Sequence, residues 1–240
     1  MNCYSSPLYT DNKLPEKFKL LSIFIEYLNS PKNRLILDVG GSRNYYNPLM
    51  EILNGNHVYL LNLDRSELAE IKNSICGNAR SLPFQGETLD MVLAFDTLEH
   101  LINPDVFLEE VFRVLKFGGI FILSTPNLSD FYSRIVFLLG YTPFNYTPSK
   151  FRVATPISKL DTSMGHVSVF TYKGLNQLLL IHGFKIIKSD GYFYCDDFYI
   201  NQNPLSTHGV GLYNLRRIIN RFLPITMREG MIFLCEKIHR

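Results

Sequence analysis

The sequence predicts an α/β protein built on a parallel β-sheet that helices cover on both faces. Two observations carry this prediction. Short, continuous apolar runs recur along the chain, and such runs are typical of strands that are buried on both faces. Segments with apolar residues at a helical spacing separate these runs, and strand–helix alternation favours parallel strands joined by crossover helices.

The predicted strands are apolar runs, several of which end at an acid, a glycine or a proline. They span residues 35–40, 57–63, 89–95, 120–125, 184–189 and 231–235. A run such as Leu35-Ile36-Leu37 before Asp38 leaves no polar face, so it indicates a strand in the interior of the sheet.

The predicted helices place apolar residues on one face. They span residues 14–28, 48–53, 66–75, 103–115, 131–139, 171–182 and 212–223. Ser66 is the expected cap of the third, and Asn103-Pro104 is a start signal for the fourth. The pair Gly118-Gly119 is expected to end that fourth helix.

We expect one domain over residues 1–240, with an N-terminal helix at about 14–29 and a lid or insertion at about 128–165. Residues 141–165 are polar, rich in proline and without clear periodicity. Loops of this length in a compact domain are often functional lids.

The composition is that of an ordinary globular chain, with 240 residues, 46% hydrophobic and 19% charged. This excludes collagen, coiled-coil and disordered classes. The net charge of +2 gives no general case for a nucleic-acid partner. Four widely spaced cysteines without a C-x-x-C pair indicate neither a disulfide framework nor a zinc knuckle, and they suit a reducing compartment. No metal site is expected. Without a signal-like apolar run, a cytoplasmic location is expected.

A glycine turn follows the first predicted strand, in Asp38-Val39-Gly40-Gly41-Ser42. Glycines between a strand and a helix let a ligand approach the backbone, and the following helix N-terminus offers unpaired N–H groups. A plain tight turn is the alternative. The G-x-G-x-x-G pattern of nicotinamide dinucleotide sites is missing, which disfavours an oxidoreductase.

Asp64 follows the second predicted strand. A carboxylate at this place can accept hydrogen bonds from both hydroxyls of a ribose. The alternative is that Asp64 caps the next helix. Together with the glycine turn, Asp64 favours a nucleotide-like ligand.

Several further motifs follow in a fixed order: Leu82-Pro83-Phe84, Leu98-Glu99-His100, Arg113-Val114-Leu115-Lys116 and Thr125-Pro126-Asn127. With Asp38 and Asp64, this ordered set closely resembles the S-adenosylmethionine-dependent methyltransferases of the Rossmann-like class. The likeness covers residues 35–127, and more weakly 165–190.

The resemblance implies a three-layer sandwich with a seven-stranded, mostly parallel sheet whose last strand, residues 231–236, is antiparallel. It implies S-adenosylmethionine as cofactor, held at the ends of successive strands. The implied cofactor-binding residues are Asp38, Gly40 and Gly41 at the methionine part, Asp64 at the ribose, Asn78 and Ala79 at the adenine, and Phe95 and Asp96 along the cleft.

Two positions depart from the family pattern. Ser42 stands where a glycine is usual, and Asn78 stands where an acid is usual. A positive φ at Ser42 would cost on the order of 1 kcal/mol or more. These departures keep open the alternative of a catalytically silent member that binds cofactor or a partner without turnover.

His100 and His166 are the candidate catalytic bases, because an imidazole titrates near neutrality. The alternatives are that His100 only shapes the cleft and that His166 anchors the lid. Arg134, Tyr146 and Arg152 are the candidate substrate-binding residues, with an aromatic ring for stacking and cations for a phosphate or carboxylate. A hydrophobic flap with a basic edge is the other interpretation of this stretch.

The expected acceptor is a small molecule or a glycan, with oxygen as the favoured acceptor atom. A faint likeness of the C-terminal part to methyltransferases of cell-surface glycans supports this expectation. No nucleic-acid partner is expected, because a large basic face is missing. The basic, amphipathic segment 212–223 leaves peripheral membrane contact open, although packing on the sheet is the commoner role. The sequence leaves the oligomeric state open.

Overall fold

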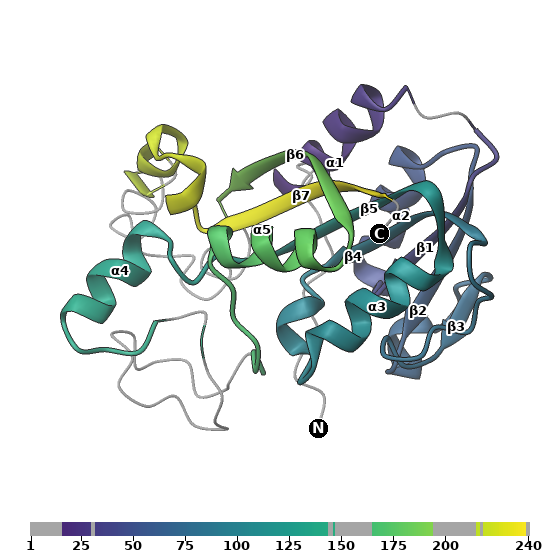
Figure 1. The fold of residues 1–240 in the computed structure, drawn as a ribbon, viewed down its shortest axis with the longest axis horizontal. Coiled ribbons are helices and arrows are strands. Elements are labelled where there is room, and N and C mark those ends of the chain that lie inside the picture. Colours follow the sequence, from purple (N-terminus) through teal and green to yellow (C-terminus); the bar gives the residue numbers. More distant parts are fainter. Residues whose placement is uncertain are drawn as a thin grey trace.

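A single β-sheet forms the centre of the computed structural model, which describes residues 16–29, 32–143, 146, 165–193, 215–216 and 218–238. Within these residues the sheet has seven strands in the order β3-β2-β1-β4-β5-β7-β6 (Figure 1). The strands are β1 (Leu35–Val39), β2 (His57–Asn62), β3 (Ser74–Cys76), β4 (Leu89–Phe95), β5 (Leu115–Pro126), β6 (Phe184–Tyr192) and β7 (Gly230–Lys237). Only β7 pairs antiparallel with its neighbours, as the family resemblance implied.

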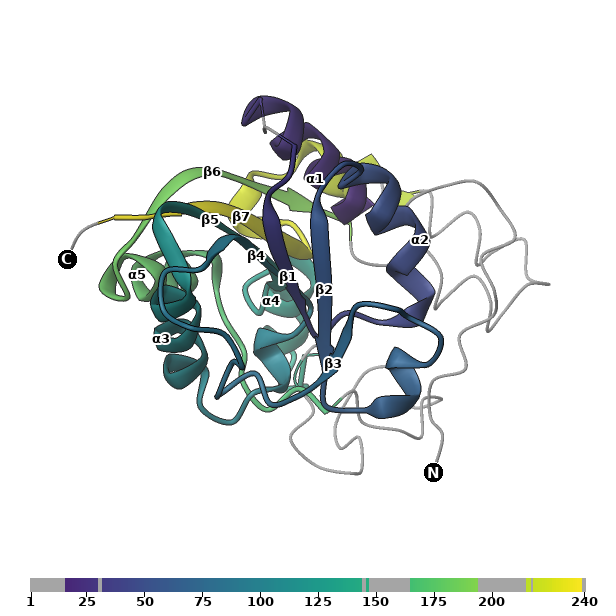
Figure 2. The same ribbon diagram turned by 90° about the vertical axis from the view of Figure 1, so that its right-hand side faces the viewer.

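Helices cover both faces of the sheet, which confirms the predicted three-layer α/β fold. They are α1 (Glu16–Tyr27), α2 (Arg43–Ile52), α3 (Pro104–Val114), α4 (Phe131–Leu138) and α5 (Tyr172–Ile181). Helices α3 and α5 lie on one face, and α1 and α2 lie on the other (Figures 1 and 2). Residues 215–216 and 218–222 are also helical, within the predicted segment 212–223.

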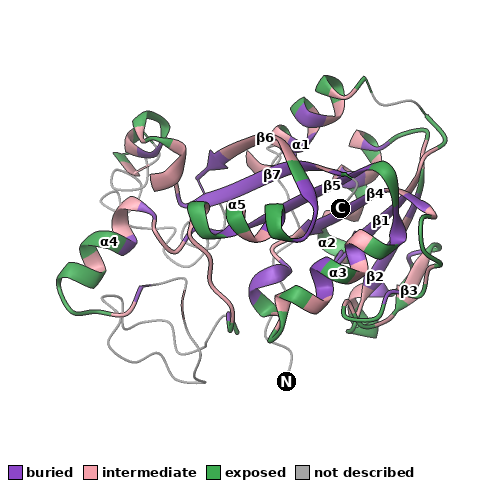
Figure 3. Cartoon of the chain, in the orientation of Figure 1, coloured by how far each residue is buried: buried purple, intermediate pink, exposed green. Residues whose placement is uncertain are grey.

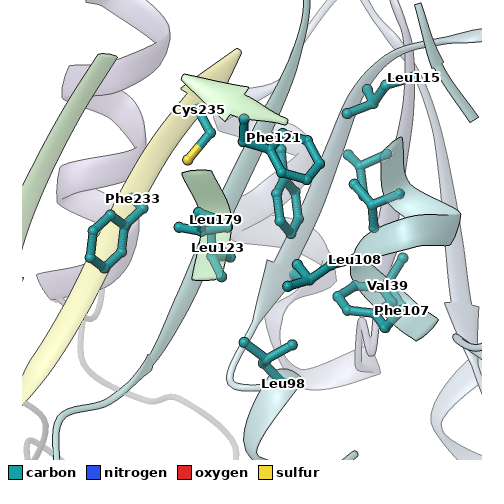
Figure 4. Close-up of a cluster of buried hydrophobic side chains, with 14 of the residues drawn as sticks. Val39, Leu98, Phe107, Leu108, Leu115, Phe121, Leu123, Leu179, Phe233 and Cys235 are labelled. Atoms are coloured by element: carbon teal, nitrogen blue, oxygen red, sulfur yellow. The ribbon is translucent and has the colours of Figure 1, made fainter. Parts of the chain in front are cut away.

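Each face of the sheet packs its own apolar core. Alternate residues of a strand point to opposite faces, so Leu37 and Val39 join the core under α3 and α5, while Ile36 joins the core under α1 and α2. Figure 4 shows the first core, where Phe107 of α3 packs beside Phe121 of β5. By the same alternation, the side chain of Asp38 lies on the α1/α2 side.

The prediction of a helix over residues 66–75 is wrong. A 3₁₀ turn, η1 (Arg65–Leu68), occupies its start and is capped by Asp64 rather than Ser66. Its end is strand β3, where Ser74 pairs with Leu60 of β2. Three residues are too few to show a strand period in the sequence, so the pairing with β2 determines this conformation.

Two other predicted boundaries shift. Helix α3 ends at Val114 and β5 begins at Leu115, so Gly118 and Gly119 lie in a strand and do not end the helix. Helix α2 begins at Arg43 rather than Pro48, directly after the glycine turn. Its N-terminus therefore faces the carboxyl edge of the sheet.

Helix α4 stands apart from the other helices, beyond the carboxyl end of β5 (Figure 1). Figure 3 shows buried central strands and an exposed α4. Its exposed apolar side chains include Phe137 and Leu138, followed by Leu139. Among the described helices, none combines the length and apolar content needed to cross a bilayer.

Candidate functional site

The residues predicted to hold a cofactor lie along one edge of the sheet. Asn78 follows β3, Asp64 follows β2, Gly40 follows β1 and Asp96 follows β4. These four strands are parallel neighbours in the order β3-β2-β1-β4, so their carboxyl ends form a continuous edge. This is the edge at which parallel α/β sheets bind ligands.

The glycine turn after β1 has no room for side chains. Gly40 has φ +80°, and a Cβ there would lie 2.2 Å from Thr97 Oγ1. A Cβ on Gly41 would lie 2.4 Å from Asp38 Oδ2. Ser42, in contrast, has φ −125° and ψ 154°, which is extended backbone that any residue adopts. The serine therefore introduces no backbone strain, and this departure from the family pattern leaves the turn intact.

Asp38 lies at the bottom of this turn and is 5% exposed. Burial raises the pKa of its carboxyl to about 7, although the positive charge of Lys17 opposes the shift. A cationic ligand group beside Asp38 would favour the charged carboxylate. The residue thus suits the amino group of an amino acid.

Asp64 and Asn78 are exposed and stabilise local turns. Asp64 Oδ1 accepts hydrogen bonds from the backbone N–H of Ser66 at 2.8 Å and from its hydroxyl at 2.7 Å. These hydrogen bonds lower the pKa of Asp64. Asn78 Oδ1 accepts a hydrogen bond from the N–H of Arg80 at 3.0 Å, and Ala79 is half-buried. Asp64 is therefore a cap, as one interpretation held, and its role at a ribose stays a prediction.

Asp96 is the most highly connected of the predicted cleft residues. It lies directly after β4 with φ +49°. Its carboxylate accepts hydrogen bonds from Lys17 Nζ, from Ser124 Oγ at 3.0 Å and from Tyr192 Oη at 3.2 Å. Burial alone would raise its pKa, but the Lys17 ammonium and these hydrogen bonds lower it overall.

Sequence reasoning missed Lys17, which comes from α1. Its ammonium lies 4.9 Å from the ring centroid of Tyr45, so it is held between the acid and an aromatic face. The neighbouring Phe18 packs against half-buried Phe95, with ring centroids 5.6 Å apart. A lysine in an amphipathic helix carries no sequence signal for this position.

The structure brings the two candidate bases together. The rings of His100 and His166 meet edge to face, with centroids 4.9 Å apart. His166 is buried, whereas His100 is exposed and its Nδ1 lies 3.3 Å from the carbonyl oxygen of Gly165. Desolvation lowers the pKa of His100, and the hydrogen bond with Gly165 opposes that shift.

Glu99 lies beside these rings, and sequence reasoning gave it no role. It is 1% exposed, and its Oε2 accepts a hydrogen bond from Thr125 Oγ1 at 2.9 Å. Its Oε1 is buried without a hydrogen-bond partner among the described residues. Burial and the charge of Asp96 raise the pKa of Glu99 well above its usual value.

For the predicted substrate-binding residues, the structure gives local contacts of two and does not describe the third. Arg134 is exposed on α4, and its Nε donates a hydrogen bond to the carbonyl oxygen of Ser129 at 2.7 Å. Tyr146 is half-buried, and its backbone N–H donates to the carbonyl of Pro143. Arg152 lies outside the described residues. The substrate-binding roles of all three stay predictions.

Two properties of the edge fit S-adenosylmethionine. A turn that excludes every side chain lets a ligand approach the backbone at Gly40 and Gly41. On either side of it, Asp38 offers a carboxyl group for an ammonium, and Asp64 offers one for ribose hydroxyls. The donor and acceptor set therefore matches an amino acid joined to a nucleoside.

Comparison with known proteins agrees with this fit. Residues 37–123 match the family model described as a methyltransferase domain. The chain is 35% identical over 119 residues to a "Probable S-adenosylmethionine-dependent methyltransferase" of Mycolicibacterium smegmatis, covering 47% of this chain and 44% of that protein. It is 27% identical over 188 residues to the (+)-O-methylkolavelool synthase of Herpetosiphon aurantiacus, covering 71% of this chain and 61% of that protein.

The fold comparison covers more of the chain. A crystal structure of a SAM-dependent methyltransferase from Methanosarcina mazei superposes with a TM-score of 0.60 at 18% identity, covering 90% of this chain and 98% of that chain. The matched regions span about half the length of the first curated relatives, 44% and 53%. In its motifs, its sheet order and these matches, the chain is similar to the Rossmann-like, S-adenosylmethionine-dependent methyltransferases.

Proposed function

We propose that this protein transfers a methyl group from S-adenosylmethionine to an oxygen atom of a small-molecule or glycan-type acceptor. One observation carries the proposal. Polar groups suited to the cofactor lie in series along the carboxyl ends of four neighbouring strands, with the histidine pair beyond Asp96. S-adenosylmethionine supplies a methyl group that its sulfonium already activates, so the protein chiefly binds and orients the reactants.

Within the proposal, each group has a stated part. Asp38 and the glycine turn hold the amino-acid end of the cofactor, and Asp64 holds the ribose. His100 and His166 are the candidates for accepting the proton of an acceptor hydroxyl, because their rings lie together at the same edge of the sheet. Arg134, Tyr146 and Arg152 are the candidates for binding the acceptor.

The choice of oxygen is supported by the O-methyl group in the name of the Herpetosiphon aurantiacus relative. A histidine pair at the edge of the cleft supports the same choice, because a hydroxyl needs a base more than an amine does. Exposed apolar side chains on α4 suit an acceptor with an apolar part.

The experiment has two stages. Calorimetric titration with S-adenosylmethionine and with its demethylated product is expected to show binding at one site. Transfer of labelled methyl from the cofactor is then measured over a panel of hydroxylated small molecules and glycans, with amines as controls. Binding without transfer across the panel would favour the catalytically silent alternative, and the absence of binding would overturn both.

A further inference from the structure

Glu99, His100 and His166 form a compact cluster of metal-ligating side chains. One ligand atom from each lies within 4.8 Å of those from the other two. Two of the residues belong to η2 (Leu98–His100), directly after β4, and the third lies in the segment before α5. We propose that these three side chains bind a divalent transition-metal ion.

The unpartnered oxygen of Glu99 is the first support. Oε2 is oriented by the Thr125 hydroxyl, while Oε1 is buried and has no hydrogen-bond partner among the described residues. Leaving a carboxylate oxygen unpaired in a protein interior is costly. A cation bound at Oε1 removes that cost, and the Thr125 hydroxyl supplies the outer hydrogen bond that metal-ligating carboxylates commonly have.

The histidines supply the second support. The Nδ1 of His100 lies 3.3 Å from the carbonyl oxygen of Gly165, and donation of Nδ1–H to this acceptor leaves the lone pair on Nε2. Metal-ligating histidines are commonly oriented by such a hydrogen bond from the other ring nitrogen to a carbonyl.

The backbone holds the two parts of the cluster together. The N–H groups of Val167 and Ser168 both donate to the carbonyl oxygen of Glu99, at 2.9 and 3.0 Å. The Ser168 hydroxyl donates to the carbonyl of Leu101. The ligands therefore stand on two segments that are fixed to each other, although 66 residues separate His100 from His166 in the sequence.

The spacing needs only a small adjustment. Ligands at about 2.0–2.1 Å from a tetrahedral ion lie roughly 3.4 Å apart. A spacing of up to 4.8 Å thus requires a contraction of about 1.4 Å at most. His100 has the most room for this adjustment, because it is exposed, whereas Glu99 and His166 are buried.

Two imidazoles and one carboxylate indicate the class of ion. This set suits zinc and iron(II), and it suits magnesium and calcium poorly because those ions prefer oxygen ligands. Three protein ligands leave a position for a further group. The role of the ion rests on the proposed methyl transfer, and in it the two histidines act as ligands in place of bases: a bound ion would lower the pKa of an acceptor hydroxyl, so that its proton passes to solvent and the electron pair stays on oxygen.

The test measures ion binding without cofactor or acceptor. Protein freed of metal by a chelator is titrated with Zn²⁺, and bound metal is counted after dialysis; Co²⁺ then serves as a spectroscopic probe. We expect one Zn²⁺ per chain and a visible Co²⁺ spectrum of low coordination number. Glu99→Gln and His166→Ala are each expected to weaken Zn²⁺ binding at least about tenfold.

Two variants keep the result interpretable. Glu99→Gln retains the shape of the side chain and an oxygen that can accept the hydrogen bond from Thr125. It is therefore expected to stay folded even if His166→Ala does not. His57→Asn is the matched control, because His57 is exposed at the start of β2, and this variant is expected to bind Zn²⁺ like the wild type. Absence of stoichiometric Zn²⁺, or equal losses in His57→Asn and Glu99→Gln, would overturn the site.

Titration with S-adenosylmethionine in parallel separates the two proposals. Cofactor binding without ion binding overturns the ion site and leaves the proposed function in place. Ion binding without cofactor binding supports the ion site and overturns the proposed function.

Discussion

The ammonium of Lys17 pairs with the carboxylate of Asp96, although 79 residues separate them in the sequence. Lys17 lies in α1 and Asp96 directly follows β4, so the pair joins an outer helix to the edge of the cleft. Their side chains are only 12% and 18% exposed. The pair therefore fixes the position of α1 at the cofactor edge.

Replacing Lys17 by methionine should destabilise the fold. Methionine keeps much of the apolar contact but leaves the Asp96 carboxylate without its cation, so we expect the free energy of unfolding to fall by about 3 kcal/mol. The double variant with Asp96→Asn should recover at least half of the loss, because it removes the uncompensated charge. Urea unfolding measures both. Lys19→Met, an exposed position in the same helix, should change little, and an equal loss there would contradict the explanation.

The glycine turn allows a prediction with a closely matched control. Gly40 and Gly140 have nearly the same φ, +80° and +78°, but a Cβ collides with Thr97 only at Gly40, and nothing lies within 4 Å at Gly140. Alanine at either position costs about 1 kcal/mol or more in backbone strain. Gly40→Ala should cost a further 1–3 kcal/mol or so from overpacking. Thermal unfolding and cofactor titration measure the difference, and equal effects in the two variants would refute it.

The ribose-binding role of Asp64 should be separable from its capping role. Asp64→Ala is expected to weaken S-adenosylmethionine binding on the order of tenfold, because an ionised hydrogen-bond acceptor is lost. Ser66→Ala removes the donor of one capping hydrogen bond and keeps the carboxylate, so cofactor affinity should change little. Calorimetric titration of both variants distinguishes binding from capping. If Ser66→Ala weakened the affinity as much as Asp64→Ala, the ribose assignment would fail.

Asp38 should make stability depend on pH. Its folded-state pKa of about 7 lies above the ordinary value of 3.8, so the folded protein binds more protons than the unfolded chain between these values. The contribution of Asp38 to the free energy of unfolding is fully present below about pH 4 and is lost as the pH rises through 7. The full loss is up to about 4 kcal/mol. Asp38→Asn removes this dependence, and the neighbouring Lys17 stays charged throughout. Urea unfolding at pH 5 and pH 8 should therefore show the variant gaining relative stability at the higher pH.

Much of the fold and of the cofactor edge was predictable, because apolar runs and the acids and glycines at their ends are local signals. The run Leu35-Ile36-Leu37 before Asp38 indicated both a buried strand and the place where it stops. The family resemblance added the antiparallel last strand, which a local pattern does not specify. The observed sheet order and strand pairing agree with the antiparallel last strand that the resemblance implied.

What was missed depends on long-range pairing. Strand β3 exists because Ser74 and its neighbours pair with β2, and its three residues show no period of their own. Lys17 and the buried oxygen of Glu99 acquire their roles only when α1 and the segment around His166 pack against the end of β4. Neither a lysine in an amphipathic helix nor a glutamate in a short motif reveals such a partner in advance.

The place of β7 has a consequence for how the chain folds during synthesis. This strand lies between β5 and β6, and among the described strands β6 pairs only with β7. Until residue 237 has left the ribosome, β5 therefore exposes a long, apolar edge with unpaired backbone groups. Such an edge invites aggregation, so we expect chaperones to engage the nascent chain during the interval between the synthesis of β5 and that of β7.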